Sequence, residues 1–452
     1  MSSNKSIARL FGTDGVRGVA GDYPLDHLTV RRLGAALVRA RPHDRGAAHL
    51  LVGRDTRESG AWIERELAFG ARGAGAEVTS AGVVPTPAIA YLTRAHSKFD
   101  VGVVISASHN PYQDNGIKVF SGGGEKFTEG VEREVEAIVA DDTWEAPSGE
   151  AGAVPCADLL GPYLDHLRAV FPEASQLAGF RIGVDCANGA TTTVAPALFA
   201  GMGFDTTVIG NEPDGRNINL HCGSTHPERL ARLVTESGCQ MGVAFDGDGD
   251  RAIFVDHQGR VVDGDAVLLM CGAHLKREGR LKGDAIVATV MSNIGLELAL
   301  KSLGIDLVRC AVGDKYVMEE MLKRGLSLGG EQSGHIIFSD YLFTGDGLCT
   351  ALNVLRTVAL TRRTFADLAA DLTTYPQVLL NVRVRTKTDF RGVPAIAAAV
   401  DRVESRVAGQ GRLLVRYSGT EPLLRVMLEG RNQDEIRTWA QEIVDVVKQE
   451  LG

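Results

Sequence analysis

Apolar and polar positions alternate along the chain in blocks. A short apolar run is followed by a loop rich in glycine, serine, aspartate or asparagine. Short apolar runs bounded by such loops are typical of strands buried on both faces of a sheet. Longer segments with apolar residues at helical spacing lie between them, so the pattern predicts α/β units. The expected buried strands lie at 49–52, 77–80, 101–105, 181–185, 241–245, 284–290 and 326–328.

Three consecutive segments repeat one layout of strand, polar loop, helix, strand and second polar loop. The second loops begin near residues 106, 246 and 329. A repeated layout indicates three related α/β domains. The last part of the chain differs, because apolar and polar residues alternate there, which is typical of a half-exposed strand. The alternating apolar residues are Val378, Leu380, Val382 and Val384.

We therefore expect an α/β protein with three similar α/β domains that have mixed sheets. A small C-terminal α+β domain follows, and the four domains surround a central cleft. At 452 residues the chain is too long for one ordinary core. Linkers are expected at the acidic stretch 141–156 and near 371–377. The predicted domains are 1–155, 156–256, 257–373 and 374–452.

Charge and cysteine usage narrow the class of protein. The formal net charge of −9 argues against a nucleic-acid partner, since polyanion binders usually carry a basic surplus. A small anionic substrate would instead need a local basic pocket. The seven cysteines are scattered without C-x-x-C spacing, which argues for a reducing cytosol and against disulfides or a zinc site. We find no apolar leader and no run of about 18 apolar residues, so we expect a soluble cytoplasmic protein without a membrane partner.

The first of the three loops, SASHNP at 106–111, presents hydroxyls at the end of the strand 101–105. The carboxyl ends of strands are the usual ligand-binding edge of α/β sheets. His109 stands beside Ser108, and Lys118 follows a predicted turn at 114–116. Taken alone, the segment is explained equally well as a polar loop without chemistry.

The second loop places Asp246, Asp248 and Asp250 on alternate residues with glycines between them. Three hard oxygen ligands that converge after a buried strand favour magnesium. An EF-hand calcium loop is the main rival, but Arg251 stands where that loop needs glycine and His257 where it needs glutamate. A solvated acidic turn is the other alternative, and burial of three carboxylates without a cation would be costly.

Two further loops combine groups suited to a sugar and to a phosphate. Glu331, Ser333 and His335 lie on a glycine-flanked loop, where a carboxylate can accept hydrogen bonds from adjacent sugar hydroxyls. A turn with a structural histidine would also explain this loop. The loop at 416–425 has a composition typical of a phosphate site, although a charged β-turn would have a similar composition. Its residues are Arg416, Ser418, Gly419, Thr420 and Arg425.

Together the loops offer a nucleophile, a metal site, a sugar-binding carboxylate and a phosphate-binding cluster. This combination predicts phosphoryl transfer on a sugar phosphate, in which positioning and charge neutralisation provide most of the catalysis. A serine hydroxyl is a poor nucleophile, whereas a phosphoserine bound to Mg²⁺ is a good phosphoryl donor.

Five motifs span the chain: FGTDGVRG (11–18), ISASHNPYQDNGIKVF (105–120), DGDGDR (246–251), GGEQSGH (329–335) and RYSGTEPLLRVM (416–427). They resemble those of the α-D-phosphohexomutase superfamily. FGTDGVRG, the glutamine of GEQSGH and the sequence SGTEP resemble its bacterial phosphoglucosamine mutase branch, whereas Tyr417 replaces an expected proline or lysine.

The resemblance implies a role for each candidate residue. Ser108 would be the phosphoserine and, with the three aspartates, would hold one Mg²⁺ per chain, which leaves Ser106 as a loop-capping residue. Glu331, Ser333 and His335 would bind the sugar, and the loop 416–425 would bind the phosphate that is not transferred. Lys118 would be a general acid or base, with His109, His335 and Arg17 nearby.

The implied reaction interconverts glucosamine 6-phosphate and glucosamine 1-phosphate through a bisphosphate intermediate, and supplies UDP-N-acetylglucosamine and cell-wall synthesis. Glucosamine 1,6-bisphosphate or glucose 1,6-bisphosphate would be the activator. A phosphomannomutase/phosphoglucomutase and a Mg²⁺-dependent sugar phosphatase are the alternatives. The intact serine and aspartates argue against a third, an inactive sugar-phosphate sensor. A homodimer is compatible with the sequence, which does not itself indicate one.

Overall fold

The computed structural model describes residues 9–41, 46–418 and 421–452. Contacts divide the chain into two compact units, Met1–Met291 with Ile305–Asp371 and Ser292–Gly304 with Leu372–Gly452. The three expected α/β repeats make up the first unit, except that helix α9 (Ile294–Ser302) groups with the second. Among the residues described, none of the helices combines the length and the apolar character needed to cross a bilayer.

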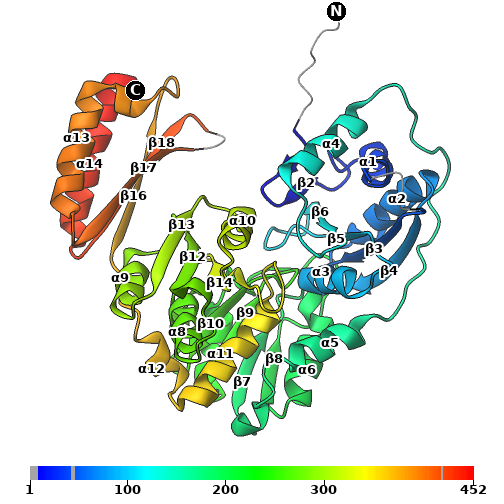
Figure 1. Ribbon diagram of the computed structural model, residues 1–452, viewed down its shortest axis with the longest axis horizontal. Helices are drawn as coiled ribbons and strands as arrows, with labels where there is room; N and C mark the ends of the chain where they lie inside the picture. Colours follow the sequence, from blue (N-terminus) through cyan, green and yellow to red (C-terminus); the bar gives the residue numbers. More distant parts are fainter. Residues whose placement is uncertain (1–8, 42–45, 419–420) are drawn as a thin grey trace, which may run out of the picture. The chain divides into compact units, whose positions relative to one another are not determined.

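The first repeat is a six-stranded mixed sheet with helices on both faces (Figure 1). Leu50 and Val103 pack in one core with helices α1 (His27–Arg39) and α2 (Gly60–Gly73), whereas Gly53 and Gly102 face helix α3 (Thr86–Ala95). A Cβ atom at Gly53 would lie 2.7 Å from Ile89 of α3, so glycine permits this close approach. The strands are β1 (Phe11–Gly12), β2 (Gly15–Val19), β3 (His49–Arg54), β4 (Glu77–Val83), β5 (Val101–Ile105) and β6 (Asp114–Ser121). The helices are α1 (His27–Arg39), α2 (Gly60–Gly73), α3 (Thr86–Ala95) and α4 (Glu129–Ala140).

One expectation for this repeat was wrong. The segment 114–116, predicted as a turn, is the start of strand β6, which pairs with β2 on one side and β5 on the other. Asn115 and Gly116 are suited to turns, but the two neighbouring strands satisfy this backbone and bury it. Lys118 therefore lies on a central strand rather than after a turn.

The second and third repeats are smaller mixed sheets. Helix α5 (Leu160–Arg168) and the short helix η1 (Ala174–Leu177) precede the second sheet. Its elements are β7 (Arg181–Asp185), η2 (Ala190–Thr193), α6 (Ala195–Gly201), β8 (Asp205–Ile209), α7 (Glu228–Glu236), β9 (Met241–Phe245), β10 (Ala252–Asp256) and β11 (Val261–Val262). The elements of the third are α8 (Gly264–Arg277), η3 (Lys282–Asp284), β12 (Ala285–Thr289), β13 (Asp306–Cys310), α10 (Asp314–Arg324), β14 (Leu328–Gly330), β15 (Ile336–Phe338), α11 (Gly347–Thr361) and α12 (Phe365–Ala369).

All three sheets contain the same four-strand arrangement. The corresponding strand orders are β4-β3-β5-β6, β8-β7-β9-β10 and β13-β12-β14-β15. In each set of four, the strand that comes second in the chain (β4, β8 or β13) lies at one end. Within each shared set of four, numbered in chain order, the first three strands are parallel and the fourth is antiparallel to the third. The connection between the third and fourth strands is in each case the loop that the sequence singled out. The prediction of three similar α/β domains with mixed sheets is confirmed.

The C-terminal domain is an antiparallel sheet of order β16-β18-β17 that packs against two helices (Figure 1). Val382, Val400 and Ile443 belong to its core. Glu429 of β18 is fully buried, and its carboxylate is stabilised there by hydrogen bonds from Arg412 Nε at 2.9 Å and from the Ile294 N–H at the start of α9 at 3.2 Å. The elements are β16 (Gln377–Arg383), η4 (Phe390–Gly392), α13 (Pro394–Val407), β17 (Gly411–Tyr417), β18 (Leu423–Gly430) and α14 (Gln433–Leu451).

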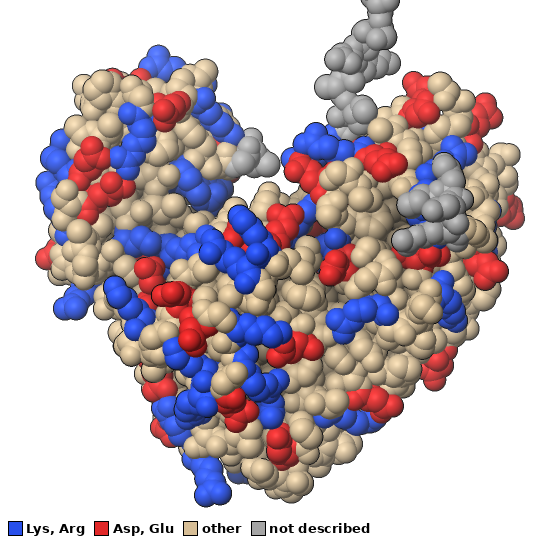
Figure 2. Space-filling view, viewed as in Figure 1, with Lys and Arg blue, Asp and Glu red and all other residues tan. Residues whose placement is uncertain are grey.

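The surface shows no separation of charge on the face in view in Figure 2, where acidic and basic side chains are interspersed.

Asp346 is an acidic residue buried inside the first unit. It caps α11 by accepting a hydrogen bond from the Cys349 N–H at 2.9 Å, and the Tyr163 hydroxyl donates to it at 2.9 Å. Burial raises the pKa of Asp346 to about 6.

We expect Asp346→Asn to make the protein more stable at pH 8. The folded-state pKa lies above the ordinary value, so the stability from Asp346 is fully present below that ordinary value and is lost as the pH rises through 6. A shift of this size corresponds to roughly 3 kcal/mol at pH 8. Asparagine is an equally good helix cap and carries no charge. Thermal unfolding at pH 5 and pH 8 tests this, with the exposed Asp165→Asn as control. An equal effect of Asp346→Asn at both pH values would contradict it.

Candidate active site

The serine loop after β5 holds Ser108 in a left-handed conformation, with φ of 53°, which is uncommon for residues other than glycine. The Ser108 N–H donates to Ser106 Oγ at 2.9 Å, and the Ser106 hydroxyl donates to Asp55 at 2.6 Å. Ser106 is thus occupied in holding the loop backbone. The Ser108 hydroxyl points instead to the second repeat.

Ser108 Oγ donates to Asp246 Oδ2 at 2.5 Å and lies 3.2 Å from His109 Nδ1. The same histidine nitrogen is 3.1 Å from Arg251 Nη1. Burial, followed by the charges of Arg251 and Arg17, lowers the pKa of His109 to about 4. His109 is therefore neutral at pH 7, and its Nδ1 can accept a hydrogen bond from serine or arginine.

The three aspartates of the loop after β9 are buried, and each offers an oxygen within 4.8 Å of the others. Burial and the charges of Asp250 and Asp248 raise the pKa of Asp246 well above its usual range. Asp248 Oδ1 and Asp250 Oδ1 are buried without a hydrogen-bond partner among the described residues. Buried carboxylate oxygens that lie close together are the ligands that Mg²⁺ prefers, so the three aspartates fit a divalent cation.

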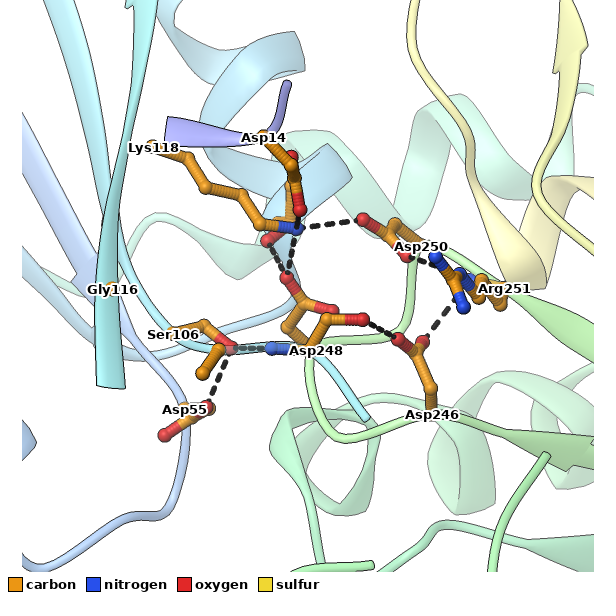
Figure 3. Close-up of polar contacts among 12 residues, drawn as sticks. Asp14, Asp55, Ser106, Gly116, Lys118, Asp246, Asp248, Asp250 and Arg251 are labelled. Atoms are coloured by element: carbon orange, nitrogen blue, oxygen red, sulfur yellow. Dashed lines mark hydrogen bonds and ion pairs between the residues drawn. The ribbon is translucent and has the colours of Figure 1, made fainter. Parts of the chain in front are cut away.

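Lys118 supplies the positive charge nearest to this cluster (Figure 3). Its Nζ lies 2.8 Å from both Asp248 Oδ2 and Asp250 Oδ2, and 3.2 Å from Asp14 Oδ2. Burial disfavours the charged amine, but the carboxylates of Asp14, Asp248 and Asp250 outweigh it and raise the pKa of Lys118 well above its usual range. Burial also raises the pKa of Asp250, but Lys118, His335 and Arg251 lower it to about 2.

A cavity of about 410 Å³ adjoins these groups. Arg17, His109, Asp250, Glu331 and His335, all singled out from the sequence, line it together. Ser333 is exposed and is not among the lining residues, although its hydroxyl lies 3.4 Å from Glu331 Oε2. The remaining lining residues are Leu10, Gly12, Thr13, Asp14, Gly15, Arg251, Val312, Gly313 and Asp314.

Asp14, Lys126 and Asp314 belong to this site and were missed in the sequence. Lys126 Nζ lies 2.6 Å from Asp14 Oδ1 and also contacts Asp314, whose Oδ2 is 3.3 Å from His335 Nε2. Asp14 also pairs with Arg17. Asp14 lies in the glycine-rich motif at 11–18, close to the candidate Arg17, and this position in the motif is the sequence signal that could have identified it.

Two donors to the backbone of the serine loop were also missed. Arg57 and Asn219 both donate to the Ser108 carbonyl, at 3.3 and 2.9 Å. Thr86 Oγ1 donates to Asp248 Oδ2 at 2.5 Å. These residues lie in segments without a recognisable motif, so only their positions in the folded chain reveal them.

The candidate phosphate-binding residues lie in the second compact unit. Arg416 of β17 and Arg425 of β18 are opposite each other in the sheet. Arg425 Nη2 donates to Ser418 Oγ at 3.3 Å, and Lys387 Nζ donates to the Ser418 carbonyl at 2.7 Å. Burial and the neighbouring Arg425 lower the pKa of Arg416. Glu421 lies 3.7 Å from Arg425 Nη2, and two adjacent guanidinium groups beside a serine hydroxyl have the composition of a phosphate site. Gly419 and Thr420 lie outside the described residues.

Comparison with known families identifies the four domains of the chain. Models of the phosphoglucomutase/phosphomannomutase family match alpha/beta/alpha domain I at residues 8–146, domain II at 161–259, domain III at 263–375 and the C-terminal domain at 379–446. The chain therefore belongs to the phosphoglucomutase/phosphomannomutase family.

Within the family, the chain is similar to proteins named phosphoglucosamine mutase. It is 48% identical over 448 residues to that of Solibacter usitatus, with 98% of this chain and 99% of the relative covered. It is 46% identical over 450 residues to that of Geobacter sp. (strain M21), with 99% of each chain covered. A phosphoglucomutase/phosphomannomutase family protein from Burkholderia thailandensis shares the fold, with a TM-score of 0.78, 24% identity and 97% of each chain covered.

Divalent cations should stabilise the first unit, because a ligand that binds only the folded state raises stability by about 2.7 kcal/mol at 100 times its Kd. We expect a higher melting temperature in Mg²⁺ at about 100 times its Kd than in EDTA. The variant Asp246→Asn/Asp248→Asn should lose most of this increase. The matched control is Asp205→Asn, which changes an exposed acid at the start of β8 and should retain it. An equal increase in all three proteins would contradict a site at the aspartates.

Proposed function

We propose that this chain is a phosphoglucosamine mutase that interconverts glucosamine 6-phosphate and glucosamine 1-phosphate. The observation that carries the proposal is the contact of Ser108 Oγ with Asp246, at 2.5 Å, beside buried aspartates that fit a cation. The choice of an amino sugar is supported by relatives named phosphoglucosamine mutase at 44–48% identity. The enzyme class is an isomerase that acts by phosphoryl transfer, and its product supplies UDP-N-acetylglucosamine and cell-wall synthesis.

The reaction proceeds in two balanced transfers. A hydroxyl oxygen of the sugar phosphate attacks the phosphorus of phosphorylated Ser108, the P–Oγ bond breaks, and a sugar bisphosphate forms. The attacking hydroxyl gives its proton to a general base and the departing Ser108 Oγ takes up a proton, and the second transfer reverses both proton movements. Ser108 Oγ then attacks the other phosphate of this bisphosphate, which returns the phosphoserine and leaves the isomeric sugar phosphate. The phosphoserine is restored after each cycle, so no phosphate is consumed.

The roles of the residues follow from their surroundings. Asp246, Asp248 and Asp250 would hold one Mg²⁺ with the serine phosphate, and the ion would supply charge neutralisation at the transferred group. Glu331 accepts a hydrogen bond from the Gly313 N–H at 3.1 Å and would accept further bonds from sugar hydroxyls, with Ser333 and His335 beside it. Arg416, Ser418 and Arg425, together with Gly419 and Thr420, would bind the phosphate that is not transferred.

Lys118 is our candidate for the general acid or base, because its Nζ contacts the aspartates directly. These carboxylates raise its pKa and keep the amine protonated, so in this state Lys118 can donate a proton but cannot accept one. Neutral His109 contacts the serine hydroxyl itself and is the second candidate. Arg17 lines the same cavity and would stabilise phosphate charge there.

Three further parts of the proposal concern the surroundings of the enzyme. The bisphosphate intermediate can leave the site before the second transfer, so glucosamine 1,6-bisphosphate or glucose 1,6-bisphosphate would serve as the activator that rephosphorylates Ser108. The seven cysteines are all free, which supports action in the reducing cytoplasm. A homodimer is part of the proposal and is tested by light scattering of the purified protein.

The function is tested by supplying glucosamine, glucose and mannose 1-phosphates, each with a bisphosphate activator. We expect the glucosamine compound to isomerise fastest, and Ser108→Ala to abolish turnover while the fold is retained, because the residue lies in a loop. The control Ser302→Ala changes an exposed serine at the end of α9 and should be fully active. Mass spectrometry should find phosphate on Ser108.

Each contrary result has a separate meaning. Faster turnover of glucose or mannose phosphate would favour a phosphoglucomutase/phosphomannomutase of the same family. Net release of phosphate without isomerisation would favour a sugar phosphatase. Phosphate found on Ser106 alone would refute the role of Ser108.

Arg425→Ala should raise KM by about 10- to 150-fold, since a hydrogen bond to a charged group contributes about 1.5–3 kcal/mol. Steady-state kinetics with glucosamine 1-phosphate measure this effect. Arg391→Ala removes an exposed arginine that pairs with Asp401 and Glu404 in the same domain, and its KM should be unchanged. An unchanged KM for Arg425→Ala would mean that the phosphate binds elsewhere.

A further inference from the structure

The carbonyl oxygens of Ser108 and Asn110 face two side-chain donors. Arg57 Nη2 lies 3.3 Å from the Ser108 oxygen and 2.6 Å from the Asn110 oxygen. Asn219 Nδ2 lies 2.9 Å and 3.1 Å from the same two oxygens. Each donor thus spans both carbonyls of the loop that carries the proposed phosphoserine.

Arg57 is part of the framework of the first domain. It is 1% exposed, and its Nη1 donates to Asp55 Oδ2 at 2.5 Å. Its Nε donates to the Asp114 carbonyl at 2.7 Å. Arg57 therefore ties the serine loop to the first sheet.

Asn219 comes from the second domain, in the segment between β8 and α7. It is buried and left-handed, with φ of 59°, and its N–H donates to the Ala187 carbonyl at 2.9 Å. Gly247 of the aspartate loop lies against it. A Cβ atom at Gly247 would be 2.6 Å from the Ser108 oxygen and 2.9 Å from Asn219 Nδ2. Asn219 thus holds the serine loop directly against the aspartate loop.

We propose, on the basis of the function proposed above, that Asn219 is a positioning residue for Ser108 in both of its phosphorylation states. The hydroxyl contact with Asp246 exists only while Ser108 Oγ carries a hydrogen, and phosphorylation removes that hydrogen. The carbonyl contacts do not involve Oγ and persist in both states. They hold Ser108 in its left-handed conformation, which aims Oγ at the aspartates throughout the cycle.

Positioning of this kind affects transition-state geometry more than substrate binding, because a small misplacement of reacting atoms greatly slows phosphoryl transfer. Asn219→Gly and Asn219→Asp both tolerate a left-handed backbone and both remove the amide donor. We expect each to lower kcat by about 10- to 100-fold, with KM changed by less than about twofold.

The matched control is Asn188→Gly. Asn188 is another buried, left-handed asparagine of the second domain, with φ of 48°, but its side chain bonds to the backbone at Glu212 and Asn217. We expect its kcat to stay close to that of wild type, because the Asn188 side chain bonds to the segment 212–217 rather than to the serine loop. A kcat near that of wild type in both Asn219 variants would overturn the proposal, as would equal losses in Asn188→Gly and Asn219→Gly.

Amide hydrogen exchange of the segment 106–111 tests the positioning without turnover. Faster exchange in Asn219→Gly than in wild type and Asn188→Gly supports it, and equal exchange in all three overturns it. If the wild-type protein does not isomerise glucosamine phosphates, the proposed function fails, while the exchange measurement still decides whether Asn219 holds the loop. If wild type is active and the Asn219 variants are equally active, only the positioning role fails.

Discussion

Burial of negative charge is the constraint on which the site of the first unit depends. Asp246, Asp248 and Asp250 are nearly inaccessible to water, and charged carboxylates in such surroundings must be paired or must bind a cation. Lys118 meets this need in part, because its ammonium contacts Asp248 and Asp250. Two of their oxygens still lack a hydrogen-bond partner among the described residues, and the three carboxylates lie close enough together to fit a divalent ion.

The same constraint joins the domains within the first unit. Lys118 comes from the first sheet, and the aspartates come from the second. Asp14 shares Lys118 with them and shares Lys126 with Asp314 of the third repeat. Pairing of charges therefore draws three loops together, although each loop folds with its own sheet.

Topology explains why these loops can meet. In each repeat the loop follows the third strand, which has neighbours on both sides and is fully buried. Strands of this kind place their carboxyl ends accurately, because packing fixes their position. The strained serine conformation, the aspartate cluster and the Glu331 loop are all supported in this way. The serine loop receives additional hydrogen bonds from Arg57 and Asn219, which leave its hydroxyl directed at the aspartates.

Local pattern and motif determined much of this protein by sequence alone. Apolar runs predicted the strands 101–105 and 241–245, which the structure contains, because this signal lies in a few consecutive residues. Residue type, spacing and the family resemblance made Ser108, the three aspartates and Arg425 candidate site residues, and their roles belong to the proposed function. Only the tertiary structure decided that 114–116 is a strand, that Glu429 is buried, and that Asp14, Lys126 and Asn219 belong to the site. The physical reason is that strand pairing, burial and charge pairing depend on residues far apart in the chain, as in the contact of Asn219 with Ser108.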